Sequence, residues 1–256
     1  MYKWQKYKEL TAVTTTREGG YSKAGYHSAN LALHVGDDLE TVRRNRRKTF
    51  GSPLLNLDEK NCVFVAQYHS DITRKVSFSE AGKGFETFES GIPADALYTK
   101  EKGLTLGIYH ADCVPLFVYV PNHQLIGIIH AGEKGSLANI SGKFMTQIMN
   151  NEAVKAEEIF IHLGPALSFA HRLISKERAE TLAALGGDIQ KAVKGTHPQY
   201  FLDLPLLNIL QLRRVGIPFE NITFSEECTY ENNDRYFSYA KEKITGRNMS
   251  FIRLNR

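Results

Sequence analysis

The sequence has few cysteines, and their scarcity excludes one class of protein. Its 256 residues include only three, Cys62, Cys113 and Cys228. They are too few and too far apart for the disulfide framework that holds small secreted domains together. A reducing compartment is the default for such a chain, and we expect the protein in the cytoplasm.

Long apolar runs are also missing. No stretch reaches the roughly 18 apolar residues of a membrane span. The N-terminal segment MYKWQKYKELTAV lacks the apolar centre of a signal peptide. We therefore expect no membrane partner.

Charge of one sign is not in large excess. The chain has 32 basic and 28 acidic side chains, a formal net charge of +4. The basic residues are scattered except in the segment 43–48, which follows the acidic residues Asp37, Asp38 and Glu40. This pattern is typical of a solvated helix, and we expect no nucleic-acid partner. With 42% hydrophobic and 23% charged residues, the chain has the composition of a globular protein that can bury a core.

Apolar and β-branched runs bounded by turn residues predict the secondary structure. Strands are predicted at residues 11–16, 62–69, 94–99, 104–110, 115–120, 124–130 and 158–163, and in the tail segments ITFSEE and FIRL. Helices are predicted at 38–50, 136–150, 175–186 and over LPLLNILQLRRV. Strands and helices do not alternate regularly, which favours an α+β fold. Because no linker or composition shift divides the sequence, we expect one domain over residues 1–256.

Three of the predicted strands lead to residues of the metal-binding type. His69 and His130 end their strands, and Cys113 lies in the turn after the strand 104–110. A thiolate and two imidazoles suit zinc, which in catalytic sites keeps three protein ligands and one open position. The spacing matches no compact zinc finger, however, and buried cysteines and strand-end histidines often have only packing roles.

Other chemistry is open to the same residues. Cys113, with His69 or His130 and the carboxylate of Asp112, is also a nucleophile set that needs no metal. His110 lies three residues before Cys113, where it could replace a ligand, act as a base or simply pack. A multicopper oxidase is disfavoured, because the nine histidines include no His-x-His pair.

The sequence resembles the bacterial laccase-domain proteins, also named multicopper polyphenol oxidoreductases and purine nucleoside phosphorylases. The resemblance covers nearly the whole chain in the family's order. It is carried by TTTREGGYS (14–22), NLALHVGDD (30–38), NRR (45–47), QYH (67–69), PADALYT (93–99), ADCVPL (111–116), HAG (130–132), LGPA (163–166), CT (228–229), FSY (237–239) and TGR (245–247).

This resemblance implies a fold, a cofactor and an activity. The fold is a single-domain sandwich of mixed β-sheets flanked by helices. Zinc, or else copper, is held by His69, Cys113 and His130, which are also the catalytic residues. The activity is phosphorolysis of adenosine, inosine and methylthioadenosine, with adenosine deamination as a second reaction. The partners are then small molecules, a purine nucleoside and phosphate, while the oligomeric state stays open.

Four further residues are candidates for the reaction. Phosphorolysis needs cations near the phosphate, and Arg46 is the candidate because it lies in the segment that resembles the family's N-R-x-R region. Asn30, Asp112 and Lys134 are candidates for binding substrate. Arg46 could instead be a solvated helix residue, and Asn30 a loop cap.

The chain departs from the family pattern at several positions. HAGEKG stands where the family usually has H-A-G-W-R-G, so Glu133 and Lys134 replace a tryptophan and an arginine. Arg172 and Leu173 stand where an aromatic-Glu-Val segment is usual, and Ala240 replaces an arginine. Either the substrate range has changed, or the chain is a non-catalytic binder of metal or nucleoside.

Overall fold

The computed structural model describes residues 1–53 and 55–255, and its middle layer is a six-stranded sheet. The strand order in this sheet is β13-β9-β7-β8-β5-β4. The strands are β4 (Thr73–Lys75), β5 (Ala96–Thr99), β7 (Val114–Val120), β8 (Leu125–Ala131), β9 (Phe160–Leu163) and β13 (Ile222–Phe224). β7 and β8, predicted as strands at 115–120 and 124–130, form an antiparallel hairpin.

A five-stranded sheet packs on one side of this layer, in the order β1-β2-β14-β6-β3. Its strands are β1 (Tyr2–Lys3), β2 (Leu10–Thr14), β3 (Cys62–Phe64), β6 (Thr105–His110) and β14 (Asn248–Leu254). A small third sheet, β10-β12-β11, comprises β10 (Leu173–Ile174), β11 (Val193–Thr196) and β12 (Gln199–Leu202).

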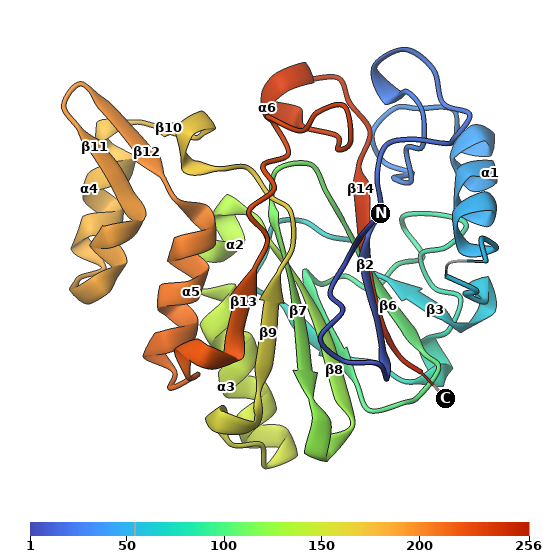
Figure 1. Cartoon of the computed structure of the whole chain (residues 1–256), viewed down its shortest axis with the longest axis horizontal. Helices are drawn as coiled ribbons and strands as arrows, with labels where there is room; N and C mark the ends of the chain where they lie inside the picture. The colour runs from blue at the N-terminus through green and yellow to red at the C-terminus, as the bar shows by residue number, and fades with distance from the viewer. Residues whose placement is uncertain (54, 256) are drawn as a thin grey trace.

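Helices cover the outer faces (Figure 1). They are α1 (Leu39–Phe50), α2 (Glu133–Leu137), α3 (Ile140–Glu152), α4 (Lys176–Ala184), α5 (Leu204–Arg214) and α6 (Tyr239–Glu242). In Figure 1, α2, α3 and α5 lie along one side of the six-stranded sheet, while the five-stranded sheet and α1 lie on the other. No helix among the described residues is long and apolar enough to cross a membrane.

Two separate cores explain why β7 and β8 are apolar at almost every position. Phe117 and Ile128 belong to the core shared with the five-stranded sheet. Leu116 and Ile129 belong to the core shared with α3 and α5. Because successive side chains of a strand point to opposite faces, a sheet covered on both faces needs apolar residues at both. The mixed α+β fold with helices around sheets is therefore as predicted.

The predicted strand at 62–69 is shorter than expected, and the reason matters for the site. Regular pairing with β6 ends at Phe64. Beyond it the side-chain amide of Gln67 takes the place of a backbone, donating to the carbonyl of Tyr109 at 2.7 Å and accepting from its N–H at 2.9 Å. The backbone is thereby released from the sheet and turns, and His69 adopts a left-handed φ of 59°.

The other differences are local. The helix predicted at 136–150 is two helices, because Asn139 between them adopts a left-handed φ of 63°. The helix at 38–50 is confirmed as α1, with the Asp38 carboxylate accepting from the Thr41 N–H at its start. The predicted strands do not include β1, β4, β10, β11 or β12.

Candidate metal centre and active site

The three ligand-type residues meet where the chain crosses from one large sheet to the other. β6 ends at His110 in the five-stranded sheet, and β7 begins at Val114 in the six-stranded sheet. Cys113 therefore lies at the start of β7, which pairs with the end of β8 so that Pro115 faces His130. The turn after Gln67 brings His69 to the same place.

The ligand atoms of these residues are close enough to share one ion. The Cys113 sulfur lies 4.0 Å from Nε2 of His69, and the ligand atoms of His69, Cys113 and His130 all lie within 4.8 Å of one another. The sequence prediction that these residues converge is thus matched in space. His110 does not join them; its Nε2 lies 2.8 Å from the Ser250 hydroxyl.

Asp95 organises two of the three ligands from behind. This fully buried carboxylate lies 2.8 Å from Nδ1 of His130, which leaves Nε2 of the ring for a metal. It also accepts the backbone N–H groups of Tyr68, His69 and Ser70 at 3.2, 3.0 and 2.8 Å, and the Ser70 hydroxyl at 2.6 Å. A carboxylate behind a histidine ligand fixes the ring and raises its basicity.

Electrostatics favours charged forms of the site residues. Burial raises the pKa of Asp95, but hydrogen bonds from His130 and Ser70 outweigh it, so the pKa lies below its usual value. Burial likewise raises the pKa of the Cys113 thiol. The charge of His130 and the hydrogen bonds from His130 and His69 outweigh this effect, so the pKa lies below its usual value. A thiolate is the form that binds metal or attacks as a nucleophile.

Gly132 leaves room for an ion beside the ligands. A Cβ at this position would lie 2.6 Å from Cδ2 of His69, 3.2 Å from the Cys113 sulfur and 3.4 Å from Cε1 of His130. The space next to all three ligands would thus be filled by one methyl group. The donor set and this open space both fit a zinc-sized ion with an exchangeable fourth position.

The ligand group lies in a cavity of about 650 Å³, a volume typical of small-molecule sites. Its wall includes His34, His110, Asp112, Glu133, His171, Arg172, Leu173, Tyr239, Ala240, Lys243 and Arg247. Nδ1 of His110 is buried with no hydrogen-bond partner among residues 1–53 and 55–255. Burial and the charges of His130 and Arg247 lower the pKa of His110 to about 3, so this ring is neutral.

Arg247 is a cavity cation that sequence reasoning missed. Its Nη1 donates to the carbonyls of Thr245 and Gly246 at 2.8 and 2.9 Å. Its backbone N–H donates to the side chain of Asn30 at 3.0 Å. The segment TGR was part of the family resemblance, and this was the available signal.

A second cation of the cavity wall, Arg172, contacts Glu133, and this contact accounts for two departures from the family pattern, at positions 133 and 172. Nη1 of Arg172 lies 3.4 Å from the Glu133 carboxylate, and Nη2 donates to the Asp112 carbonyl at 3.2 Å. Arg178 lies 2.9 Å from the same Glu133 carboxylate. Glu133 therefore requires cations beside it, and Arg172 supplies one from the position where the family pattern has no positive charge.

Asp112 lines the cavity, but its carboxylate is occupied by the protein. It accepts the hydroxyls of Thr229 and Ser238, both at 2.7 Å, and the N–H of Ala240 at 2.6 Å. Asp112 is therefore the residue that ties the loop before Cys113 to the C-terminal segments. The contact at position 240 is made by the backbone, so alanine can make it as well as arginine.

Three sequence-predicted site residues, Arg46, Asn30 and Lys134, lie outside the cavity, and their predicted roles are wrong on that point. Arg46 is fully buried, and its guanidinium donates to the carbonyls of Leu31, Gly84 and Phe85 and to the Tyr109 hydroxyl. Four of the five guanidinium N–H groups thus donate to acceptors inside the protein, as a buried guanidinium requires, and the fully buried side chain does not reach the cavity.

Asn30 is also fully buried. Its side chain contacts Ala32 and Asp37 and accepts from the backbone of Arg247. It positions a cavity residue rather than touching the cavity. Lys134 is exposed on α2, next to Glu133, but is not part of the cavity wall.

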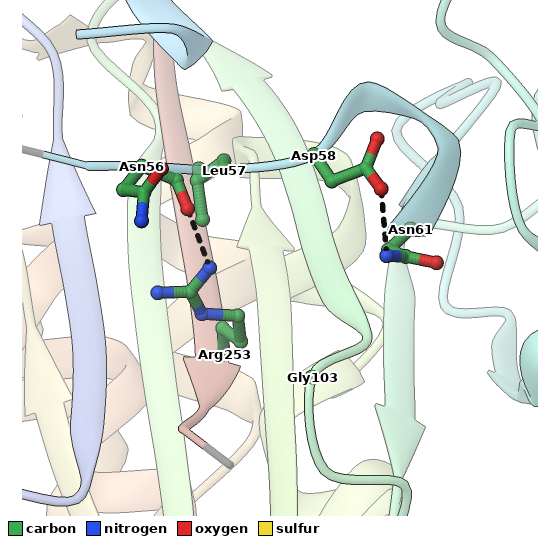
Figure 2. Close-up of a pocket in the computed structure, with 6 residues that line it drawn as sticks. All are labelled: Asn56, Leu57, Asp58, Asn61, Gly103 and Arg253. Atoms are coloured by element: carbon green, nitrogen blue, oxygen red, sulfur yellow. Dashed lines mark hydrogen bonds between the residues drawn. The ribbon is translucent and has the colours of Figure 1, made fainter. Parts of the chain in front are cut away.

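Another cavity lies at the opposite end of β14 (Figure 2). Its volume is about 420 Å³, and its wall consists of Asn56, Leu57, Asp58, Asn61, Gly103 and Arg253. Arg253 donates to the Asn56 carbonyl, and Asn61 donates to Asp58. These six residues include no histidine or cysteine, so the metal-type chemistry belongs to the first cavity.

Comparison with known proteins identifies the family. The sequence model described as "Multi-copper polyphenol oxidoreductase laccase" matches residues 11–255. The chain belongs to this laccase family. Its curated relatives include "Purine nucleoside phosphorylase YlmD" of Bacillus subtilis (strain 168), 35% identical over 251 residues, which span 97% of this chain and 90% of that protein.

A second curated relative and a solved structure are similar to the chain over nearly its whole length. "Purine nucleoside phosphorylase YfiH" of Shigella flexneri is 30% identical over 250 residues, covering 97% of this chain and 96% of that one. The crystal structure of YlmD from Geobacillus stearothermophilus superposes with a TM-score of 0.94 at 31% identity and covers 99% of this chain and 94% of that one. The family resemblance stated from sequence is confirmed, and the relatives' names indicate an enzyme of the phosphorylase kind.

Proposed function

We propose that this laccase-family protein is a zinc-dependent purine nucleoside phosphorylase. The proposed substrates are adenosine, inosine and methylthioadenosine, with adenosine deamination as a side reaction. One observation supports this most strongly: the ligand trio His69, Cys113 and His130 shares a cavity of about 650 Å³ with two arginines. The relatives named purine nucleoside phosphorylase at 30 to 35% identity support the same reaction.

Zinc held by the trio would supply a Lewis acid and, for deamination, a water whose pKa is lowered toward about 7. The protein's own residues have the other roles. Arg247 and Arg172 are the proposed phosphate-binding cations, because both line the cavity and guanidinium groups match phosphate oxygens. Tyr239 offers an aromatic face at the rim, and the unpartnered Nδ1 of neutral His110 offers one hydrogen bond to the substrate.

A metal-free cysteine hydrolase is the second candidate, and the hydrogen bonds of His130 favour it. Asp95, His130 and Cys113 form a carboxylate–imidazole–thiol series of the kind used in nucleophilic catalysis. The carboxylate in this series is Asp95, whereas the sequence suggested Asp112. The two candidates differ in whether activity survives removal of the metal.

One experiment separates the candidates. Purified protein is loaded with zinc and incubated with adenosine or inosine, with and without phosphate, and free base and inosine are measured by chromatography. We expect base release only with phosphate, loss of that release after chelation, and recovery when zinc is returned. Cys113→Ala and His130→Ala should abolish it, whereas His123→Ala should not, because His123 lies on η4 (Pro121–His123), at the end of the β7–β8 hairpin opposite the site.

Three other results of this experiment would change the assignment. Tight nucleoside binding without turnover would replace the phosphorylase with a non-catalytic binder. Activity that survives chelation but is lost after thiol alkylation would favour the hydrolase. Absence of both base and inosine from every substrate would refute the assignment.

A further inference from the structure

A second group of metal-type side chains lies beside the first cavity. It consists of His171, Cys228 and Glu231, whose ligand atoms all lie within 4.8 Å of one another. Nε2 of His171 lies 3.1 Å from the Glu231 carboxylate. None of these residues belongs to the first group, and sequence reasoning assigned a role to none of them.

The backbone holds the two contributing segments together. His171 ends the short helix η6 (Phe169–His171), and the other two residues follow β13. The N–H of Thr229 donates to the Ala166 carbonyl at 3.0 Å, and the N–H of Ser168 donates to the Cys228 sulfur at 3.3 Å. The group therefore lies on two chain segments that are held together by hydrogen bonds, and it does not depend on contacts between surface side chains alone.

The orientation of the imidazole is also fixed. The ring of His171 stacks on the ring of Tyr230, with centroids 4.0 Å apart and planes 15° apart. In this stacked orientation Nε2 faces the Glu231 carboxylate, and the ligand atoms of the group stay within 4.8 Å of one another. A ligand whose ring is already held loses less conformational entropy when it binds an ion.

We propose that His171, Cys228 and Glu231 bind a second divalent transition-metal ion of the zinc type. In tetrahedral zinc sites, ligand atoms lie about 3.3 to 3.6 Å apart, so only small side-chain movements are needed here. A thiolate and a carboxylate together neutralise the charge of a divalent ion. The sulfur is nearly buried, at 3% exposure for Cys228, whereas the Glu231 side chain is 60% exposed and gives an ion a path from solvent.

A buried hydroxyl without a partner among the described residues belongs to the same pair of segments. Oγ of Ser168 is buried and has no hydrogen-bond partner in the described part of the chain. It belongs to the residue whose N–H contacts the Cys228 sulfur. Buried hydroxyls are normally paired, so this one marks an incompletely satisfied polar environment in the segment that contacts Cys228.

The location gives the second ion a structural consequence. His171 lines the wall of the first cavity, so the ion would join the η6 segment to the segment 228–231 at the edge of that cavity. It would fix one wall without sharing a ligand with the first centre. This role does not depend on the proposed function.

Metal counting tests the proposal. The protein and its variants are equilibrated with excess zinc, freed of unbound ion, and measured for zinc per chain by elemental analysis. We expect two zinc ions in the natural chain, one in Cys113→Ser, one in Cys228→Ser and none in the double variant. If the first centre takes no zinc, the difference between the natural chain and Cys228→Ser should still be one ion.

Two further variants guard against misfolding of Cys228→Ser. His171→Ala and Glu231→Gln change partly exposed side chains, and each should also remove one ion. His123→Ala is the matched control, because His123 pairs with Glu158 at 3.5 Å without a thiol and should leave the count unchanged. An unchanged count in His171→Ala would overturn the proposal.

Cobalt gives a readout independent of stoichiometry. In the Cys113→Ser background, Co²⁺ should produce a thiolate-to-cobalt charge-transfer band in the near ultraviolet, and Cys228→Ser should remove it. The third thiol, Cys62, is fully buried in the core and is not expected to contribute. Absence of the band in Cys113→Ser would likewise overturn the assignment.

Discussion

Replacing Asp95 with asparagine removes a charge from the centre of the first site without changing its shape. One carboxylate oxygen accepts from the His69 N–H and lies 2.8 Å from Nδ1 of His130. The other accepts from the N–H groups of Tyr68 and Ser70 and from the Ser70 hydroxyl. An asparagine has one oxygen and one NH₂ group, so either orientation points NH₂ toward at least two donors.

The magnitude follows from that count. Each hydrogen bond to a charged group contributes about 1.5 to 3 kcal/mol, so two lost bonds should lower the free energy of unfolding by about 3 to 6 kcal/mol. The metal should also bind more weakly, because loss of a carboxylate behind a histidine ligand typically costs about 10- to 100-fold in affinity. Both effects come from one side chain that never touches the ion.

Two assays check the prediction. Urea unfolding of the metal-free protein gives the stability, and competition with a chromophoric chelator gives the zinc affinity. Asp71→Asn is the matched control. Asp71 directly follows Ser70 on the loop that Asp95 holds, but its partner is the exposed Lys143, so both the stability and the zinc affinity should hardly change. If Asp95→Asn kept its stability within about 1 kcal/mol and its zinc affinity within about threefold, the role given to Asp95 would be wrong.

Three other substitutions test separate parts of the structure. Gly132→Ala should lower zinc affinity about tenfold or more, since its Cβ would lie 2.6 Å from Cδ2 of His69; an unchanged affinity would mean that the space beside the ligands is not needed. Arg46→Met should lower the free energy of unfolding by about 3 kcal/mol or more but leave the KM for phosphate unchanged, and the reverse result would restore Arg46 as a phosphate ligand. Burial lowers the pKa of His162 from 6.5 to about 4, so between these pH values the unfolded chain binds a proton that the folded chain does not, and stability falls as pH falls. Between pH 6.5 and 4.5 in urea titrations, the free energy of unfolding of His162→Gln should therefore fall by about 2 to 3 kcal/mol less than that of the natural chain. The variant His197→Gln, which changes an exposed residue, should follow the natural chain.

The sequence predicted the metal-type trio because its signal is local. His69, Cys113 and His130 each come at or near the end of an apolar run, and strands of packed sheets end together. Asp95 could not be found this way. Its function depends on reaching the loop 68–70, and no spacing in the sequence indicates that distance.

Arg46 and Asn30 show the opposite error. Both carry polar groups in segments that resemble the family, and a polar group in such a segment suggests a ligand contact. In the folded chain both are fully buried, and their polar atoms hold loops together. Burial is set by the packing of α1 against distant segments, which periodicity within one helix cannot reveal. Arg247, which does line the cavity, lies in a segment whose polar character is no stronger.

The position of β14 bears on how the protein is made. This strand inserts between β2 and β6, yet it follows all the other described strands along the chain. Until it emerges from the ribosome, β2 and β6 each present an open edge, and such edges invite pairing with other chains. The Ser250 hydroxyl of the same strand contacts His110, which lines the cavity. A nascent chain can therefore carry all three metal-type ligands before the strand that supports the cavity wall has been added. Assembly of the site should therefore wait until β14 has been synthesised and has paired with β2 and β6.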